Sequence, residues 1–444
     1  MSEASWRDRL GAKLVDLPAA VGRVESGQTL AIAPYTSTPF TLCDALAERG
    51  RKGELERVRI DHLASLTCWT SDDLKGAFEL HDNYATPPNR EACHAGDMEY
   101  LPVGLWKSYE LPPGVSPEPD VFLVPVSPPN AAGFCSFGPG VWMSRTMSQR
   151  ARLVIAEIQP DFIRTFGENY IHVDEIDLFV EGEIPTGSPP AVERSEEDVA
   201  TVEAICTQVA IELVNDGDTL QMGVGAVSSA LGHFLDFRND LGVQTELITG
   251  GIAELVRKGV VTGRRKSIHR EKVVGSALVA LDRAEMESMH ENPSFELYDF
   301  GYTDDLRRLI QIENFVTVNN ALVVDLTGQV SAEALDHRMF TGVGGQTVFM
   351  IAGAYSEGGK SVSVLPSSAV PSTTGVRVSR IVPTLPPGTP VTVPRTYVDY
   401  VVTEQGIAEL RGKTLKERAR ALAEISHPDF RSELHVRARE LYHA

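Results

Sequence analysis

Two stretches that share one pattern decide the fold: VESGQTLAIAPYTSTPFTLCDAL at residues 24–46 and VNDGDTLQMGVGAVSSALGHFL at residues 214–235. Each reads V-x-x-G-x-T-L and continues into a short apolar strand, a turn of small residues and an amphipathic helix, and the second lies 190 residues after the first. A further strand-like run follows each copy, RVRIDHL at 57–63 and VQTELIT at 243–249. Because self-similarity at a fixed offset marks a repeated structural unit, the sequence predicts a duplicated β-turn-α-β unit.

The rest of the chain alternates between strand-like and helix-like patterns. The runs VFLVPV, RLVIAEI, LVVDLTG, SVSVLP and PVTVP are short and β-branched, whereas TLKERARALAEI has helical spacing. Such alternation is typical of α/β domains with largely parallel, buried sheets. The segment 181–198 is rich in Pro, Gly and acidic residues and indicates a linker. We therefore predict an α/β fold of two duplicated open domains, residues 1–190 and 191–444, with the active site in the cleft between them.

Composition excludes several partners. Acidic residues outnumber basic ones 61 to 41, and the formal net charge of −20 opposes binding to nucleic acid or to an anionic membrane. A single phosphorylated ligand remains compatible with this charge, since a local cluster of N–H groups and one basic side chain can hold it. The N-terminus has no apolar leader and no apolar run is long enough to span a membrane, so we expect a cytoplasmic protein. Its cysteines form no C-x-x-C pair and are expected to be reduced: Cys43, Cys68, Cys93, Cys135 and Cys206.

The first glycine turn, GVGA at 223–226, follows the strand-like DTLQM. In open α/β sheets ligands bind outside the carboxyl ends of the strands, and a helix that begins there directs its N–H groups at them. The turn alone is weakly specific, because Ser228 replaces the third glycine of the dinucleotide pattern and the P-loop lysine is absent. Taken alone it is more often a plain strand-to-helix turn.

Glu246 is an acidic residue near the start of the strand-like run VQTELIT. A lone glutamate there is most often an edge-strand carboxylate that faces water. The alternative is a partly desolvated carboxylate that acts as a nucleophile, which requires nearby N–H donors. A second glycine turn, TGVGGQ at 341–346, offers such donors. Spacing alone does not show whether the two turns and the carboxylate converge.

The ordered motifs of the C-terminal half resemble those of one known family. They are GVGA, QTELITGG, DLTGQVSAE, TGVGGQ, YSEGGKSV, SRIVPTLPPGTPVT and VDYVVTEQGIAELRGKTLKERARAL; VSPPNAAGFCSFG and YIHVDEIDLFVEGEIP agree in the N-terminal half. Together they closely resemble the acetyl-CoA hydrolase/transferase family, the class I CoA-transferases that include 4-hydroxybutyrate CoA-transferase. The resemblance covers nearly the whole chain, and the set is far more specific than any single motif.

The resemblance implies a covalent reaction. The family's glutamate, which falls on Glu246, attacks an acyl-CoA, forms a mixed anhydride, becomes a glutamyl-CoA thioester and passes CoA to a second carboxylic acid. Ping-pong kinetics would follow. The second glycine turn would hold the reacting carboxylate or oxyanion, with the N–H of Gly345 as donor. The residues expected to bind CoA are Gly223, Val224, Gly225, Ala226, Val227, Leu322, Thr341, Gly342 and Gly344.

The same resemblance implies acyl-CoA and a small carboxylic acid as substrates, no permanently bound cofactor or metal, and a homodimer. His172, beside Asp174 and Glu175, fits a core or interface histidine better than a metal ligand, since no partner stands at ligand spacing. Three other functions stay open: a thioester hydrolase in which water reaches the intermediate, a non-catalytic acyl-CoA-binding protein, and, least favoured, a sugar-phosphate isomerase.

The chain departs from the family where charge is usual. After the second turn it reads GGQTVFMIAGA, with Val348 and Ile351 in place of an Asp and an Arg, and Val323 stands where a Glu is usual. We read this as a hypothesis that one exchanged acid is bulkier or more apolar than acetate or a hydroxy acid; a change confined to structural contacts explains it equally well. The basic run RRKSIHREK at 264–272 and Arg377 are candidates for contact with the CoA phosphates, although a solvated face is the usual role of such a run.

Overall fold

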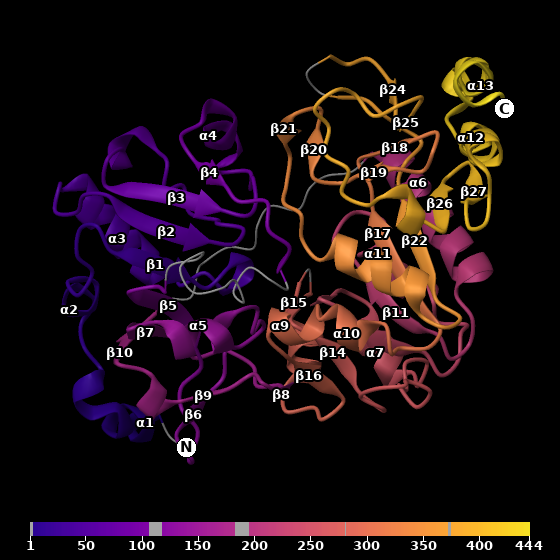
Figure 1. Ribbon diagram of the computed structural model, residues 1–444. Coiled ribbons are helices and arrows are strands. Elements are labelled where there is room, and N and C mark those ends of the chain that lie inside the picture. Colours follow the sequence, from indigo (N-terminus) through magenta and orange to yellow (C-terminus); the bar gives the residue numbers. More distant parts are fainter. Residues whose placement is uncertain (1–2, 106–117, 183–194, 280, 372–373) are drawn as a thin grey trace.

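The computed structural model describes residues 3–105, 118–182, 195–279, 281–371 and 374–444, and contains two large sheets that stand side by side (Figure 1). The domain boundary expected near residue 190 lies outside the described residues. The N-terminal half of the chain builds the first sheet, and the C-terminal half builds nearly all of the second. The α/β class and the largely parallel sheets predicted from the sequence are confirmed.

The first sheet has the order β10-β7-β5-β1-β2-β3-β4, and all of its strand pairs are parallel. Its interior strand β5 (Val121–Val126) is the run VFLVPV, which is buried at every position, as expected for a parallel strand covered on both faces. The other strands are β1 (Thr29–Ile32), β2 (Val58–His62), β3 (Phe78–Asp82), β4 (Glu99–Tyr100), β7 (Leu153–Ile158) and β10 (Leu178–Glu181).

The second sheet has the order β27-β26-β22-β17-β11-β12-β14-β16-β8 and is parallel except for the pair β26–β27. Its outermost strand β8 (Phe166–Gly167) comes from the N-terminal half of the chain. The other strands are β11 (Thr219–Met222), β12 (Gly242–Gln244), β14 (Val273–Gly275), β16 (Phe295–Leu297), β17 (Phe315–Asn320), β22 (Lys360–Val364), β26 (Tyr400–Thr403) and β27 (Gly406–Glu409).

The duplicated unit is present in both halves at the predicted offset. Thr29 begins β1 and Thr219 begins β11, and each strand pairs in parallel with the next strand of its unit, β2 or β12. In the first copy α3 (Phe40–Arg51) joins the two strands. Leu30 of β1 and Leu220 of β11 are both fully buried, so the leucine of the T-L pair supplies a core position in each sheet.

The helix expected after the first glycine turn is not an α-helix. Residues 226–230 form turns, followed by the short 3-10 helix Leu231–Phe234. The serines of this segment compete for its hydrogen bonds, because Ser229 Oγ accepts from the N–H of Gly225 at 3.2 Å and Ser228 Oγ contacts the amide of Asn320. An α-helix dipole therefore does not support the turn, contrary to the sequence-based expectation.

Two further elements differ from their predicted form. The run VQTELIT is broken into β12 and β13 (Leu247–Ile248), and Glu246 lies in the bend between them. PVTVP forms no strand and contributes one isolated bridge from Val393 to Val330. The predicted helix TLKERARALAEI is α12 (Leu415–Glu424), which packs with α13 (Pro428–Tyr442) near the C-terminal edge of the second sheet (Figure 1).

An arm of the N-terminal half, residues 139–142, crosses to the second half. The N–H of Val141 donates to the carbonyl of Ser276 at 2.9 Å, and the N–H of Leu278 donates to the carbonyl of Pro139 at 2.7 Å. Trp142 is fixed in the arm by its indole N–H, which donates to Ser37 Oγ at 2.9 Å. These contacts lie one strand from Glu246. They join the N-terminal half of the chain to the C-terminal half next to this residue. Among the residues the structure describes, no helix has the length and apolar character needed to cross a bilayer.

Candidate active site

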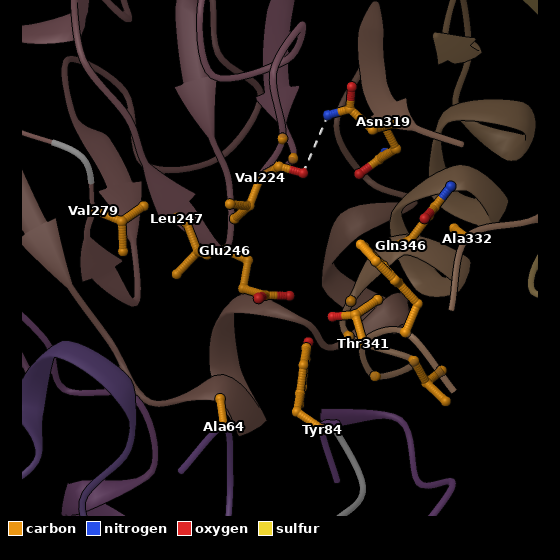
Figure 2. A pocket seen from close by; sticks show the side chains of 18 of the residues that line it. Ala64, Tyr84, Val224, Glu246, Leu247, Val279, Asn319, Ala332, Thr341 and Gln346 are labelled. Atoms are coloured by element: carbon orange, nitrogen blue, oxygen red, sulfur yellow. Dashed lines mark hydrogen bonds between the residues drawn. The ribbon is translucent and has the colours of Figure 1, made fainter. Parts of the chain in front are cut away.

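A cavity of about 680 Å³ lies between the two halves and is lined by both. Glu246 projects into it, with Leu247 and Val279 on one side, Thr341 and Gln346 on the other, and Tyr84 across from it (Figure 2). Every site residue predicted from the sequence lines this cavity: Gly223, Val224, Gly225, Ala226, Val227, Glu246, Leu322, Thr341, Gly342, Gly344 and Gly345.

Glu246 is held at the carboxyl end of the second sheet. The Thr245 hydroxyl donates to the carbonyls of Met222 and Leu247, both at 3.2 Å, which ties the bend after β12 to the end of β11. The backbone carbonyl of Glu246 accepts from the N–H of Ser276 at 2.7 Å, just past β14. Three neighbouring parallel strands therefore fix the backbone of Glu246, and only its half-buried side chain is left to reach into the cavity.

The carboxylate of Glu246 meets the second glycine turn at the beginning of α11 (Gln346–Tyr355). The N–H of Gly345 donates to the carboxylate, and Gly345 is also the N-cap residue of this helix, whose amino end favours negative charge. Burial raises the pKa of Glu246 to about 7, and the neighbouring Asp304 side chain and the Gly345 N–H oppose that rise. The result is a partly desolvated carboxyl beside oriented donors, as a carboxylate nucleophile requires.

The first glycine turn approaches the end of β17 very closely. A Cβ on Gly225, whose φ is +142°, would collide with the side-chain amide of Asn320. That amide donates to the carbonyl of Val224 at 3.1 Å, and Asn319 and Gln221 exchange two hydrogen bonds of 2.8 and 3.1 Å beneath the turn. Glycine at 225 therefore serves the close packing of this turn, which leaves the Val224 side chain exposed at the mouth of the cavity.

The wall opposite Glu246 comes from the N-terminal half and is organised by Asp82 at the end of β3. This buried carboxylate accepts from the N–H groups of Ala64, Ser65 and Tyr84, each at 2.9 Å. Burial raises the pKa of Asp82 to about 6, and the three N–H donors oppose that rise. The ring of Tyr84 thereby packs on the second glycine turn. The backbones of Tyr84 and Gly342 also form an isolated antiparallel β-bridge.

Several cavity residues were missed by sequence reasoning, among them Tyr84, Asn319, Asn320 and Arg380. Asn319 and Asn320 end a buried strand, so the rule that ligands gather at carboxyl ends could have found them. Tyr84 had no such signal, since its place depends on how the two halves meet. Asp304, which contacts Glu246, lies in the stretch YTDDL, which contains no recognisable motif.

The uncharged replacements of family residues do not lie at the cavity. Val348 is buried in a small cluster with Leu309, Ile312 and Phe315, and Val323 lies in β18 (Val323–Asp325). Neither they nor Ile351 are among the lining residues, so they carry no argument about the acids exchanged. Their positions favour the alternative that these replacements changed structural contacts rather than the choice of acid.

The basic run at 264–272 does not reach the cavity either. The ammonium of Lys266 is buried and donates to the carbonyls of Val243 and Lys272, each at 2.8 Å. Arg377 pairs with Glu197 at 3.1 Å and lines a smaller cavity that adjoins the large one, sharing Asp198, Thr201 and Pro366 with it. Arg380 lines the large cavity instead.

His172 lies at the surface end of β9 (Ile171–His172), where its Nδ1 caps a short turn by accepting from the N–H of Asp174 at 3.3 Å. This is a structural role. Within the described ranges no group of three or more His, Cys, Asp or Glu side chains is gathered as a metal site would require.

Comparison with known proteins identifies the family of this chain. The acetyl-CoA hydrolase/transferase N-terminal domain model matches residues 4–186, and the C-terminal domain model of the same family matches residues 283–438. The 4-hydroxybutyrate coenzyme A transferase of Clostridium kluyveri is 34% identical over 97% of this chain and 98% of its own. The butyryl-CoA:acetate CoA-transferase of Anaerostipes caccae is 32% identical over 97% of this chain and 96% of its own.

Solved structures agree as well. RipA from Yersinia pestis superposes with a TM-score of 0.88 at 30% identity, covering 100% of both chains. The 4-hydroxybutyrate CoA-transferase from Porphyromonas gingivalis gives 0.77 at 29% identity over 98% of this chain and 100% of its own. The chain belongs to the acetyl-CoA hydrolase/transferase family, and it is a CoA-transferase.

Proposed function

We propose that this enzyme moves CoA from an acyl-CoA to a free carboxylic acid through a glutamyl-CoA thioester on Glu246. The Glu246 carboxylate attacks the thioester carbonyl and expels the CoA thiolate, which leaves a mixed anhydride. The thiolate then attacks the Glu246 carbonyl of the anhydride and releases the first acid as its carboxylate. An acceptor carboxylate attacks the glutamyl thioester, and the expelled thiolate takes the new acyl group from the resulting anhydride. The Glu246 carboxylate is regenerated with no net proton transfer.

The observation that carries this proposal is the position of Glu246. It is a carboxylate between two glycine turns at the carboxyl end of a parallel sheet, and it accepts from the Gly345 N–H at the start of α11. A carboxylate is a poor nucleophile in water, so partial burial removes solvation and the fixed N–H stabilises the charge that develops at its carbonyl. A sugar-phosphate isomerase does not require a carboxylate placed beside the N–H of a second glycine turn. An acyl-CoA-binding protein does not require a desolvated carboxylate.

Trapping of the intermediate tests the proposal. The enzyme is incubated with a series of acyl-CoAs, treated with borohydride and analysed by mass spectrometry, in wild type and in Glu246→Ala. A CoA adduct, or reduction of the residue at 246 to its alcohol, is expected in wild type only. No modification by any acyl-CoA, under conditions where CoA binding is measurable, would contradict the covalent mechanism and favour a binding protein.

Transfer is favoured over hydrolysis by the surroundings of Glu246. Apolar and aromatic groups make up much of the cavity wall, among them Tyr35, Leu63, Trp142, Leu247, Val279 and Phe300. Such a wall disfavours ordered water at the thioester. CoA release should therefore depend on the acceptor acid, whereas equal release without any acceptor would identify a hydrolase.

The same wall predicts a preference for acids with an apolar chain. Trp142 packs edge-on against Tyr35 and Phe300, with ring centroids 6.2 and 5.7 Å apart. The charged lining residue Arg90 is committed to the carbonyls of Ala85 and Phe340, at 3.3 and 2.7 Å. A second carboxylate, as in succinate, would therefore face mainly apolar and aromatic groups at this wall.

We expect kcat/KM to rise about fourfold for each methylene added between acetyl-CoA and hexanoyl-CoA, because each buried methylene contributes about 0.8 kcal/mol. The measurement is initial rates across the series with one fixed acceptor. The isosteric change Val279→Thr adds a hydroxyl to the wall and should flatten this rise. A strict preference for acetyl-CoA would contradict the proposed substrate class.

Arg380 is our candidate for a CoA phosphate contact. Burial lowers the pKa of its guanidinium, which lines the large cavity near Asp198 and Glu404. A charge-assisted hydrogen bond contributes about 1.5–3 kcal/mol, so Arg380→Ala should raise the KM for acyl-CoA roughly tenfold to a hundredfold and leave kcat unchanged. Arg377→Ala, which removes a cation outside the large cavity, is the matched control and should leave KM near wild type. Equal effects of both variants would refute a specific phosphate contact.

A further inference from the structure

Asp304 presents a buried carboxyl oxygen with no donor to bind it. It follows α9 (Phe300–Thr303), its side chain is fully buried, and Oδ1 accepts from the Thr303 hydroxyl at 2.9 Å. Oδ2 is also buried and receives no hydrogen bond from the described donors. Buried polar atoms are rarely left in this state without a reason, so Oδ2 requires an explanation.

The group that Oδ2 meets is the carboxyl of Glu246. A Cβ added to Gly345 would lie 2.7 Å from Asp304 Oδ2 and would collide with Glu246 Oε2, so the two oxygens converge on one point at the glycine turn. Two ionised carboxylates in this position have only acceptors to offer each other, and they repel. One proton held between them turns the contact into a hydrogen bond.

The surroundings place that proton on Asp304. Burial raises the pKa of Asp304 well above its usual range, and the charge of Glu246 raises it further, as does Asp299. Tyr84 also faces the pair, and burial together with the charge of Glu246 keeps its phenol neutral by raising its pKa. Asp305, the next residue, points to Arg307 at 2.9 Å. Glu246, in contrast, is half-buried and accepts the Gly345 N–H, so it is the partner that ionises first.

We propose that Asp304 works as a neutral carboxylic acid whose Oδ2–H donates a hydrogen bond to Glu246, and that CoA transfer requires this proton. The inference rests on the proposed role of Glu246 as nucleophile. Before the reaction the hydrogen bond orients the carboxylate beside the Gly345 N–H. The proton is not transferred to substrate, so the balance of the reaction is unchanged.

The same hydrogen bond acts when the Glu246 carbonyl is itself attacked. In the glutamyl thioester, the acceptor carboxylate adds its electron pair to the carbonyl carbon and negative charge moves to the carbonyl oxygen. Gly345 N–H and Asp304 O–H both donate to that oxygen until the thiolate leaves. An ionised Asp304 would instead place a second negative charge beside it, which opposes the step.

The pH profile therefore has two limbs. Below the acid limb Glu246 is protonated and does not attack; above the alkaline limb Asp304 has lost its proton. Because the pKa of Glu246 is raised to about 7, activity rises as the pH passes through neutrality. Because the pKa of Asp304 is raised well above its usual range, activity is lost again as the pH rises through the value of Asp304. The two values belong to the pair, and the measured limbs report the pair as a whole.

Asp304→Asn is the decisive variant. The Thr303 hydroxyl already marks Oδ1 as the acceptor side, so the amide nitrogen of asparagine would stand at the position of Oδ2 and donate to Glu246 without titrating. We expect Asp304→Asn to keep kcat within about tenfold of wild type at pH 7 and to lose the alkaline limb of the kcat profile. Asp304→Ala, which has no donor, should lose roughly a hundredfold to a thousandfold in kcat.

Asp299→Asn is the matched control. Asp299 is a buried carboxylate of the same segment, but it accepts from the N–H groups of Gly301 and Thr146 at 3.1 and 3.0 Å and does not serve Glu246. This variant should keep the alkaline limb, moved to lower pH because the charge of Asp299 helps to raise the pKa of Asp304. Thermal unfolding of each variant separates misfolding from loss of chemistry.

Three results would overturn the inference: a wild-type profile without an alkaline limb, an Asp304→Asn profile that keeps it, or a folded Asp304→Asn enzyme that is inactive at every pH. Trapping of the glutamyl-CoA adduct distinguishes the two levels of the proposal. An adduct at residue 246 together with any of these results would refute only the role of Asp304, whereas absence of the adduct in wild type would refute the nucleophile itself.

Discussion

Glu246→Ala is expected to lower kcat for CoA transfer by roughly 10⁴-fold or more, because removal of a covalent nucleophile eliminates the intermediate rather than weakening one contact. The readout is steady-state transfer between two acids, with the adduct followed by mass spectrometry. Binding of acyl-CoA should change little, since the glycine turn at 223–227 and Arg380 remain in place. Relief of the carboxylate pair should also leave Asp304 without its charged neighbour, so folding is expected to survive.

The control for this variant is Glu333→Gln. Glu333 is another buried glutamate, whose pKa is raised by burial and which accepts from the Thr392 hydroxyl at 2.9 Å, but it does not line the cavity. Its loss is expected to affect stability and to leave kcat within a few-fold of wild type. A Glu246→Ala enzyme with kcat close to that of Glu333→Gln would rule out the covalent mechanism.

Gly345→Ala is expected to lower kcat by about a hundredfold to a thousandfold, the cost of misplacing one oxyanion donor. The φ of Gly345 is −90°, which alanine adopts without strain, so the effect comes from the new methyl group alone. That methyl collides with Glu246 Oε2 and lies 2.7 Å from Asp304 Oδ2 and 3.1 Å from the ring of Phe349. The carboxylate must move away from the N–H that supports it.

A double variant separates this collision from a general defect of the turn. In Glu246→Ala the oxygen that the methyl strikes is gone, so the loss of unfolding temperature caused by Gly345→Ala should be smaller there than in wild type. Equal losses in the two backgrounds would show that the methyl disturbs the turn for another reason.

Much of the fold was readable from local sequence. The repeated T-L motif predicts a buried strand at the same offset in each half, and it does so because both strands need the same inward leucine. The helix after the first glycine turn was wrongly predicted, since Ser228 and Ser229 bond to neighbouring groups instead of extending a helix. The hydrophobic periodicity of a sequence carries no information about such side-chain hydrogen bonds.

The site was predictable where motifs carry it and not where folding assembles it. Glu246 and the two glycine turns are recognised by their order along the chain. Tyr84 and Trp142 belong to the N-terminal half and reach the cavity only in the folded chain. Asp304 can be recognised as a site residue only once its carboxyl oxygen is known to lie beside Glu246. The domain boundary near 190, the homodimer and the cytoplasmic location stay predictions.

Strand β8 has a consequence for any attempt to divide this protein. Residues 195–444 produced alone would lack the strand that covers β16, leaving an unpaired edge of the kind that recruits other chains. They would also lack the arm at 139–142 that bonds to the segment after β14. The fragment should aggregate when made by itself and become tractable when its N-terminal counterpart is co-expressed, so ancestral duplication has here been followed by mutual dependence of the two copies.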